Sequence, residues 1–161
     1  MVLGVVGLTA CSPSLNWREV RLQRLVAVLP CKPDHAQRTV ALAHLPVVLE
    51  MVGCEASGAL FALSHVRLDQ PEQVKTARAD WRLEALTAMR AGAVQELPFK
   101  PPQPAVSALH LVAQGTRPDG SVVVARLLWL AHGPDLFHIA VYGDRPSDES
   151  TETLFLGLRL Q

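Results

Sequence analysis

The sequence predicts an α+β fold in which an antiparallel β-sheet is flanked by one long helix and a C-terminal helix. Three observations support this prediction. Short apolar runs bounded by turn residues occupy residues 17–68, apolar residues recur at helical spacing between residues 70 and 92, and three more strand-like runs alternate with turns between residues 107 and 143. A chain of 161 residues suits one domain, which we place at residues 17–161.

The first part of this domain has the pattern of an antiparallel meander. It opens at Trp17, Val20 and Leu22, and the Pro-flanked PCKPD and the tetrapeptide EASG supply turns. The strand-like runs between these turns are residues 25–30, 38–44, 46–53 and 59–68. Because the connections are short, we expect neighbouring strands to pair antiparallel.

Residues 70–92 have the pattern of the main helix. Asp69 can cap its start, Glu72 follows three residues later as in a capping box, and Gly92 can end it. Apolar residues recur at helical spacing at Val74, Ala77, Trp81, Ala85 and Ala88. We therefore expect this face to pack on the sheet, with Trp81 as its anchor.

The second half of the domain returns to strands. The proline-rich LPFKPPQP at residues 97–104 suits neither a helix nor a central strand, so we expect a surface connection. Strand-like runs follow at residues 107–114, 121–131 and 136–143, joined by the turns RPDG and HGPD. Ser147 can then cap a terminal helix.

The first eleven residues, MVLGVVGLTAC, contain no charge. The apolar run is too short to cross a bilayer as a helix, which takes about 20 residues, but it has the length of the apolar region of a secretory signal. LTAC resembles the lipobox of bacterial lipoproteins. This resemblance implies a signal peptide at residues 1–10, a lipid on Cys11 and a tether at residues 11–16.

The resemblance also implies a location in the bacterial cell envelope, with the domain facing the periplasm and anchored to the membrane by lipid. In lipoproteins an Asp after the lipidated Cys tends to mean inner-membrane retention, so Ser12 slightly favours the outer membrane. The first basic residue is Arg18, whereas a secretory signal begins with positive charge. The alternative is that VLGVV is a buried first strand.

Three cysteines are present, and a lipid on Cys11 leaves Cys31 and Cys54. An exported chain lies in an oxidising compartment, so we predict a disulfide between these two. A metal or redox site is the sharper alternative, but the sequence has neither C-x-x-C nor a Cys/His cluster at ligand spacing. If the lipobox assignment is wrong, two buried thiols in a cytosolic protein become the favoured interpretation.

Charge and motifs exclude several function classes. Fifteen basic residues balance fifteen acidic ones without a basic block, so we expect no nucleic-acid partner. HExxH, GxSxG, P-loop and GxGxxG motifs do not occur, and we predict no catalytic residue, metal or cofactor.

Histidines leave one enzymatic alternative open. His110 and His138 lie in predicted strands and, with Asp119 or Asp135 from nearby turns, would form a hydrolytic or metal site if they converged. Ser64 precedes His65 directly, and neighbouring side chains of a strand point to opposite faces, which argues against a catalytic pair.

The order of elements, with AVLPCKPD early, ALFALSHV before the helix and LFHIAVYG late, resembles the Mog1/PsbP-like family found in many small bacterial lipoproteins. The resemblance implies an α/β/α sandwich and a non-enzymatic protein that binds partners or supports membrane assemblies. It transfers no functional residues.

The predicted function is therefore a binding or scaffolding module of the cell envelope, for an envelope protein or a small ligand. The alternatives are a hydrolase or metal-dependent enzyme with a His-containing site on the sheet, and a cytosolic interaction domain in which residues 1–10 form a strand.

Overall fold

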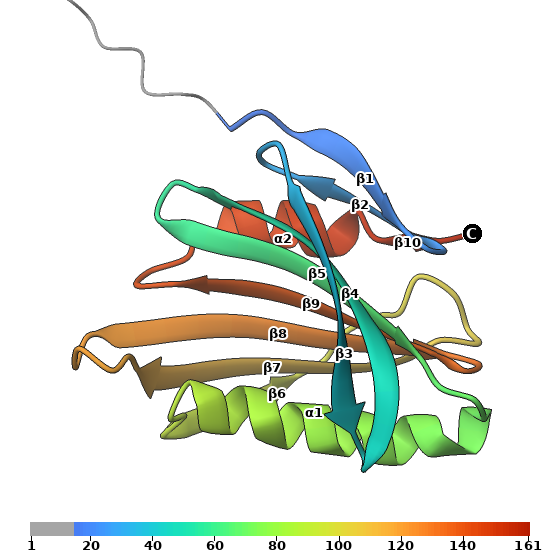
Figure 1. Cartoon of the computed structure of the whole chain (residues 1–161). Helices are drawn as coiled ribbons and strands as arrows, with labels where there is room; N and C mark the ends of the chain where they lie inside the picture. The colour runs from blue at the N-terminus through green and yellow to red at the C-terminus, as the bar shows by residue number, and fades with distance from the viewer. Residues whose placement is uncertain (1–14) are drawn as a thin grey trace, which may run out of the picture.

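The computed structural model describes residues 15–161. Within this range the chain forms ten strands and two α-helices (Figure 1). The strands are β1 (Arg18–Leu22), β2 (Leu25–Leu29), β3 (Asp34–Leu42), β4 (Leu45–Ala56), β5 (Ala59–Arg67), β6 (Ala93–Leu97), β7 (Ser107–Thr116), β8 (Val122–His132), β9 (Asp135–Gly143) and β10 (Arg159–Leu160). The helices are α1 (Val74–Ala88), which follows the 3-10 turn η1 (Pro71–Gln73), and α2 (Asp148–Leu156).

The strands form two antiparallel sheets. Seven of them make the main sheet in the order β3-β4-β5-β9-β8-β7-β6, and a smaller sheet has the order β1-β2-β10. The predicted α/β/α sandwich is therefore wrong: strands dominate the described chain, and a second sheet covers part of one face of the main sheet. The cause is that β2 pairs with β1 on one side and with β10, from the other end of the chain, on the other side, instead of extending the main sheet.

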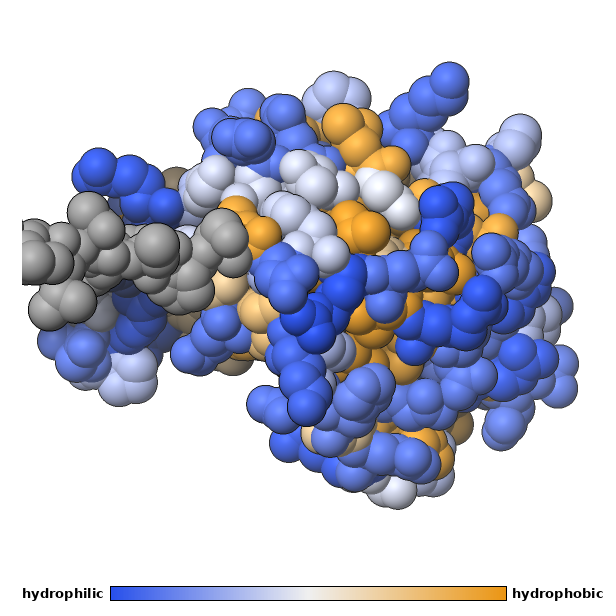
Figure 2. All heavy atoms as spheres, turned by 90° about the horizontal axis from the view of Figure 1, so that it is seen from above, coloured by the Kyte–Doolittle hydropathy of each residue, from blue (hydrophilic) through white to orange (hydrophobic). Residues whose placement is uncertain are grey.

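One face of the main sheet, which we call the closed face, carries Phe61, Leu63, Phe137 and Ile139. These side chains pack with β1, β2 and α2 in one core cluster, and each is at most 2% exposed. Figure 2 views the molecule from the side of β1 and β2 and shows mostly hydrophilic residues on the outside, with apolar patches between them. The small sheet and α2 thus separate this core from solvent.

The predicted disulfide is confirmed, and it ties the small sheet to the main one. Cys31 lies in the loop after β2, and its sulfur bonds Cys54 of β4 on the closed face. The Cα atoms are 5.9 Å apart, within the range of ordinary disulfides. Cys11, the predicted leader at residues 1–10 and most of the predicted tether lie outside the described residues.

The opposite face, which we call the α1 face, is covered by α1 (Figure 1). Val74 and Ala77 are buried, and Trp81 is half-buried against the core, as its predicted anchoring role requires. Figure 1 shows β3 and β4 crossing in front of the middle of α1. There the Asp80 carboxylate accepts a hydrogen bond of 2.8 Å from the amide of Ala43, just after β3. The β3–β4 hairpin therefore holds α1 near its middle, away from its C-terminal end.

The ends of α1 differ from the prediction. The turn η1 begins after Gln70, whose amide donates to the Gln73 side chain at 3.0 Å, so Asp69 and Glu72 do not form the cap. The helix ends at Ala88 instead of continuing to Gly92, because Arg90 adopts a left-handed conformation with φ of 49°.

Helix α2 begins as predicted. The Ser147 hydroxyl caps it by accepting from the amide of Ser150 at 3.2 Å. No helix in residues 15–161 is long and apolar enough to cross a membrane.

Candidate functional site

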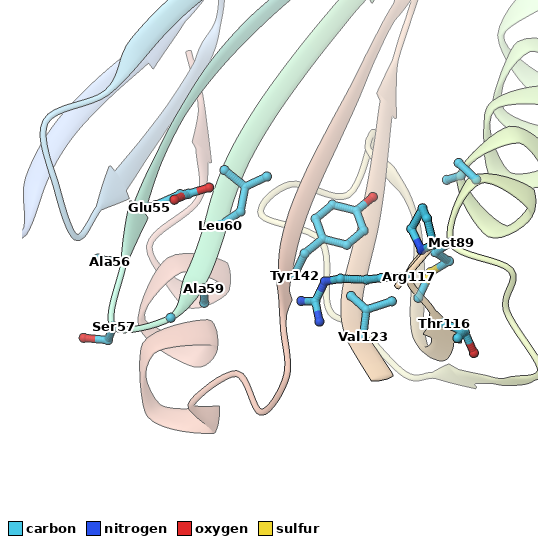
Figure 3. Close-up of a pocket in the computed structure, with 14 residues that line it drawn as sticks. Glu55, Ala56, Ser57, Ala59, Leu60, Met89, Thr116, Arg117, Val123 and Tyr142 are labelled. Atoms are coloured by element: carbon cyan, nitrogen blue, oxygen red, sulfur yellow. The ribbon is translucent and has the colours of Figure 1, made fainter. Parts of the chain in front are cut away.

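A groove of about 640 Å³ opens on the α1 face at the C-terminal end of α1 (Figure 3). This volume lies within the range of about 300 to 1,000 Å³ that is typical of ligand pockets. Its lining residues are Glu55, Ala56, Ser57, Gly58, Ala59, Leu60, Ala85, Ala88, Met89, Thr116, Arg117, Pro118, Val123 and Tyr142. They come from four parts of the chain, so the fold assembles a site that no short segment contains.

The first wall is the end of α1, held against β7 by close backbone contact. The amide of Thr116 donates to the carbonyl of Met89 at 2.9 Å, and the amide of Gly92 donates to the carbonyl of Gln114 at 2.9 Å. Gly115 makes this approach possible, because a Cβ there would lie 1.9 Å from the Met89 carbonyl oxygen. The close contact between α1 and β7 therefore requires glycine at position 115, although the surrounding sequence is that of an ordinary strand.

The second wall is the hairpin between β4 and β5. Ser57 and Gly58 have φ of 50° and 75°, the left-handed pair that a two-residue type I′ turn requires. This turn lies within EASG, as the sequence predicts. It places Glu55 on β4 and Leu60 on β5 at the edge of the groove.

The third wall is the turn between β7 and β8, which is braced by hydrogen bonds. Arg117 Nη1 donates to the Val122 carbonyl at 2.8 Å and to the carboxylate of Asp144. Asp119 Oδ1 accepts from the amide and the hydroxyl of Ser121, at 2.9 and 2.6 Å. Arg117 is thereby held at the rim as a fixed cation.

The floor is apolar except for one hydroxyl. Figure 3 shows Tyr142 between Leu60 on one side and Met89 on the other. Val123 and Met89 are 6% and 7% exposed, whereas Leu60 stays 37% exposed in the open groove. Burial raises the pKa of Tyr142 above its usual value, so its hydroxyl stays neutral at physiological pH.

A second, polar cavity of about 520 Å³ lies between the main sheet and the β1–β2 turn. At its edge His65 Nε2 and Asp135 Oδ1 are 2.8 Å apart, and both side chains are 6% exposed. Arg67 Nη1 donates to the two oxygens of Asp135 at 3.1 and 3.0 Å. Across the cavity Glu50 accepts from Gln23 at 2.7 and 2.9 Å.

The His65–Asp135 pair has the geometry of an oriented imidazole, but its surroundings favour a structural role. Both oxygens of Asp135 are bound by Arg67, which faces it across the β5–β9 ladder. Ser64 points to the α1 face, where its neighbour across the ladder, His138, contacts Trp81. Among the described residues, no group of three His, Cys, Asp or Glu side chains could hold a metal. The cluster therefore cross-links β5 and β9.

The structure does not bring together the histidines that the sequence offered for an enzyme. His110 packs against Phe99 and Phe155, and its Nε2 accepts from Arg126 at 3.4 Å. His138 is stacked on Trp129, with ring centroids 4.2 Å apart. Burial lowers the pKa of His138 to about 4, so this ring is neutral. Asp135 instead bonds His65, a pair that the sequence analysis missed.

Comparison with known proteins gives little guidance. No family model matches the sequence, and no curated protein matches it. Among solved structures the chain is similar to a Pseudomonas aeruginosa protein of unknown function described as a proposed regulator. The two share 13% sequence identity over 84% of this chain and 88% of that chain, with a TM-score of 0.39. A likeness at this level carries no argument about fold or function.

Proposed function

We propose that this protein is a non-enzymatic, lipid-anchored binding module of the bacterial cell envelope, facing the periplasm, and that it binds through the groove on the α1 face. The observation that carries the proposal is the groove itself. It combines an apolar floor with a few fixed polar groups, Tyr142 within it and Arg117 at its rim, which is the usual composition of a ligand site.

The disulfide supports the location. Cys31 and Cys54 are bonded, and such bonds form and persist in oxidising compartments such as the periplasm. The LTAC sequence at residues 8–11 supplies the motif for a lipid anchor. Stable anchoring takes two or more acyl chains, which a lipoprotein Cys carries.

The location is tested by expressing the chain from its native start in a bacterium and separating membrane from soluble fractions. We expect the protein in the membrane fraction, and mass spectrometry should find diacylglycerol on an N-terminal Cys11. Cys11→Ala should release the protein from that fraction. An intact Met1 on the wild-type protein would refute the anchor.

Binding through the groove is tested by site-specific photo-crosslinking in intact cells. A photoreactive amino acid at Ala88, which lines the groove, should give an adduct of defined mass. The same residue at Thr87 is the control, because this neighbour is exposed on the same helix outside the groove lining. Equal labelling at the two positions, or none at Ala88, would refute the groove as the binding surface.

A further inference from the structure

We propose that the groove binds a fatty carboxylate, with the aliphatic chain along the floor and the carboxylate at Arg117. This inference rests on the proposed function, which makes the groove the binding surface, and it adds the chemical class of the ligand.

The lining favours a narrow, flexible chain over a flat ring. Small side chains, those of Ala85 and Ala88, form the α1 wall of the groove and leave room for a narrow chain. The lining contains one aromatic ring, that of Tyr142, so a planar ligand would have no pair of rings between which to stack. Leu60, Met89 and Val123 supply aliphatic contact along the floor.

The polar groups define where a head would lie. The Arg117 side chain is 35% exposed, and all its hydrogen bonds within residues 15–161 are made by Nη1. Nε and Nη2 therefore keep donors for a carboxylate, in the planar arrangement that such groups match. The acid of the lining, Glu55, comes from β4, with β5 and β9 between it and β8. Because the Arg117 charge is already paired with Asp144, a carboxylate head would be held there by hydrogen bonds from Nε and Nη2 and not by an excess of positive charge.

The Tyr142 hydroxyl gives the floor one further polar contact. No hydrogen bond of this hydroxyl occurs within the part of the chain that the structure describes, although the side chain is half-buried. Figure 3 shows this hydroxyl pointing away from the Arg117 guanidinium, so the carboxylate head binds at Arg117 alone. A purely apolar ligand would leave the free Arg117 donors unused.

The first test is calorimetric titration of the wild-type protein with octanoate, decanoate and dodecanoate, each below its micelle-forming concentration. Burial of one methylene is worth about 0.8 kcal/mol, which corresponds to a three- to fourfold gain in affinity per added CH₂. We expect that slope over the series. Absence of binding, or an affinity independent of chain length, would overturn the proposal.

Two matched variants locate the aliphatic chain of the ligand. Ala88→Trp places a large ring in the groove at an exposed helix position, where folding should tolerate it, and should weaken dodecanoate binding at least tenfold. Thr87→Trp makes the same addition one residue away and should leave affinity within twofold. Equal losses in both variants would contradict binding in the groove. Circular dichroism checks that each variant is folded.

A third variant locates the carboxylate head of the ligand. Wild-type protein should prefer octanoate over octanol by about tenfold, the scale of a charge-assisted hydrogen bond. Arg117→Gln should remove this preference, and the ratio of two affinities is insensitive to general damage to the turn. An unchanged ratio would overturn the assignment of Arg117.

These results separate the two proposals. If no carboxylate binds but a photoreactive residue at Ala88 still gives its adduct in cells, the ligand class is wrong and the binding function stands. If the Ala88 adduct is also missing, the groove has no binding role and both proposals fail.

Discussion

The two faces of the main sheet are built from the same strands but are covered differently. On the closed face, β1, β2, α2 and β10 come from both ends of the chain and leave Leu63 of β5 fully buried. On the α1 face, only Val74 and Ala77 among the 15 residues of α1 are buried, and Leu60 of the same strand β5 remains 37% exposed. The face covered by several segments keeps only a polar cavity near the β1–β2 turn, whereas the face covered by one helix that ends early keeps an apolar groove.

The largest expected effect tests this contrast within one strand. Leu63→Ala should lower the free energy of unfolding by about 3 to 5 kcal/mol, because it leaves a cavity in the closed face. Leu60→Ala should cost about 1 kcal/mol or less, because its side chain already contacts solvent in the groove. Urea unfolding of both variants measures this difference. Equal costs would show that the groove is filled in solution.

The dependence of stability on acidic pH should show how well the α1 face excludes water from His138. His138 has a folded-state pKa of about 4 and an ordinary value of 6.5, so the unfolded chain binds more protons between these pH values. Stability should therefore fall by up to about 3 kcal/mol as pH drops from 6.5 to 4.

His138→Phe should flatten this part of the pH profile, measured by urea unfolding at a series of pH values. Burial also lowers the pKa of His110, so a smaller loss in the same direction should remain in the variant. A profile identical to that of the wild type would mean that water reaches His138.

Removing the disulfide should weaken the closed face without altering the groove. The bond joins residues 23 positions apart, so replacing both cysteines by Ala should cost about 3 kcal/mol in the chain-entropy model. Addition of a reductant should destabilise the wild type by a similar amount and leave the double variant unchanged. If reductant does not affect the wild type, Cys31 and Cys54 are not bonded in solution.

The smallest expected effect concerns the wall of the groove. Gly115→Ala brings a methyl group onto the Met89 carbonyl and should cost about 1 to 3 kcal/mol as the end of α1 moves away. Gly92→Ala is the control, because a Cβ there would meet nothing within 4 Å. Thermal unfolding compares them. Similar midpoints would show that α1 does not pack closely on β7.

Much of the chain's local structure could be predicted from the sequence. Apolar runs and turn residues indicated eight of the strands near their observed positions, and Ser147 indicated the start of α2. Strands β6 and β10 were missed: β6 is five residues long and mostly exposed, and β10 has two residues that lie after a helix. Neither strand has enough alternation of apolar and polar residues to be distinguished from a loop.

The way the strands divide between sheets was not predictable by the same means. β1 and β2 have the pattern of strands in any sheet. They form a separate sheet because β2 pairs with β1 and with residues 159–160. Such pairing depends on packing between distant segments, which periodicity does not report.

The candidate site was also hidden from sequence reasoning. Leu60, Ala88, Arg117 and Tyr142 lie in separate elements, and each has the features of an ordinary strand, helix or turn residue. Gly115 looks like any glycine in a strand until the neighbouring helix is placed. The disulfide was predicted because only a few cysteines could pair, whereas His65 and Asp135 are 70 residues apart and had many other potential partners.

The difference between the two faces is tested most directly by methyl NMR during a titration with dodecanoate. The account predicts shifts for methyl groups of Leu60, Ala88, Met89 and Val123, which line the groove, and unchanged signals for Leu63 and Ile139 on the closed face. Shifts of equal size on both faces, or none in the groove, would contradict it.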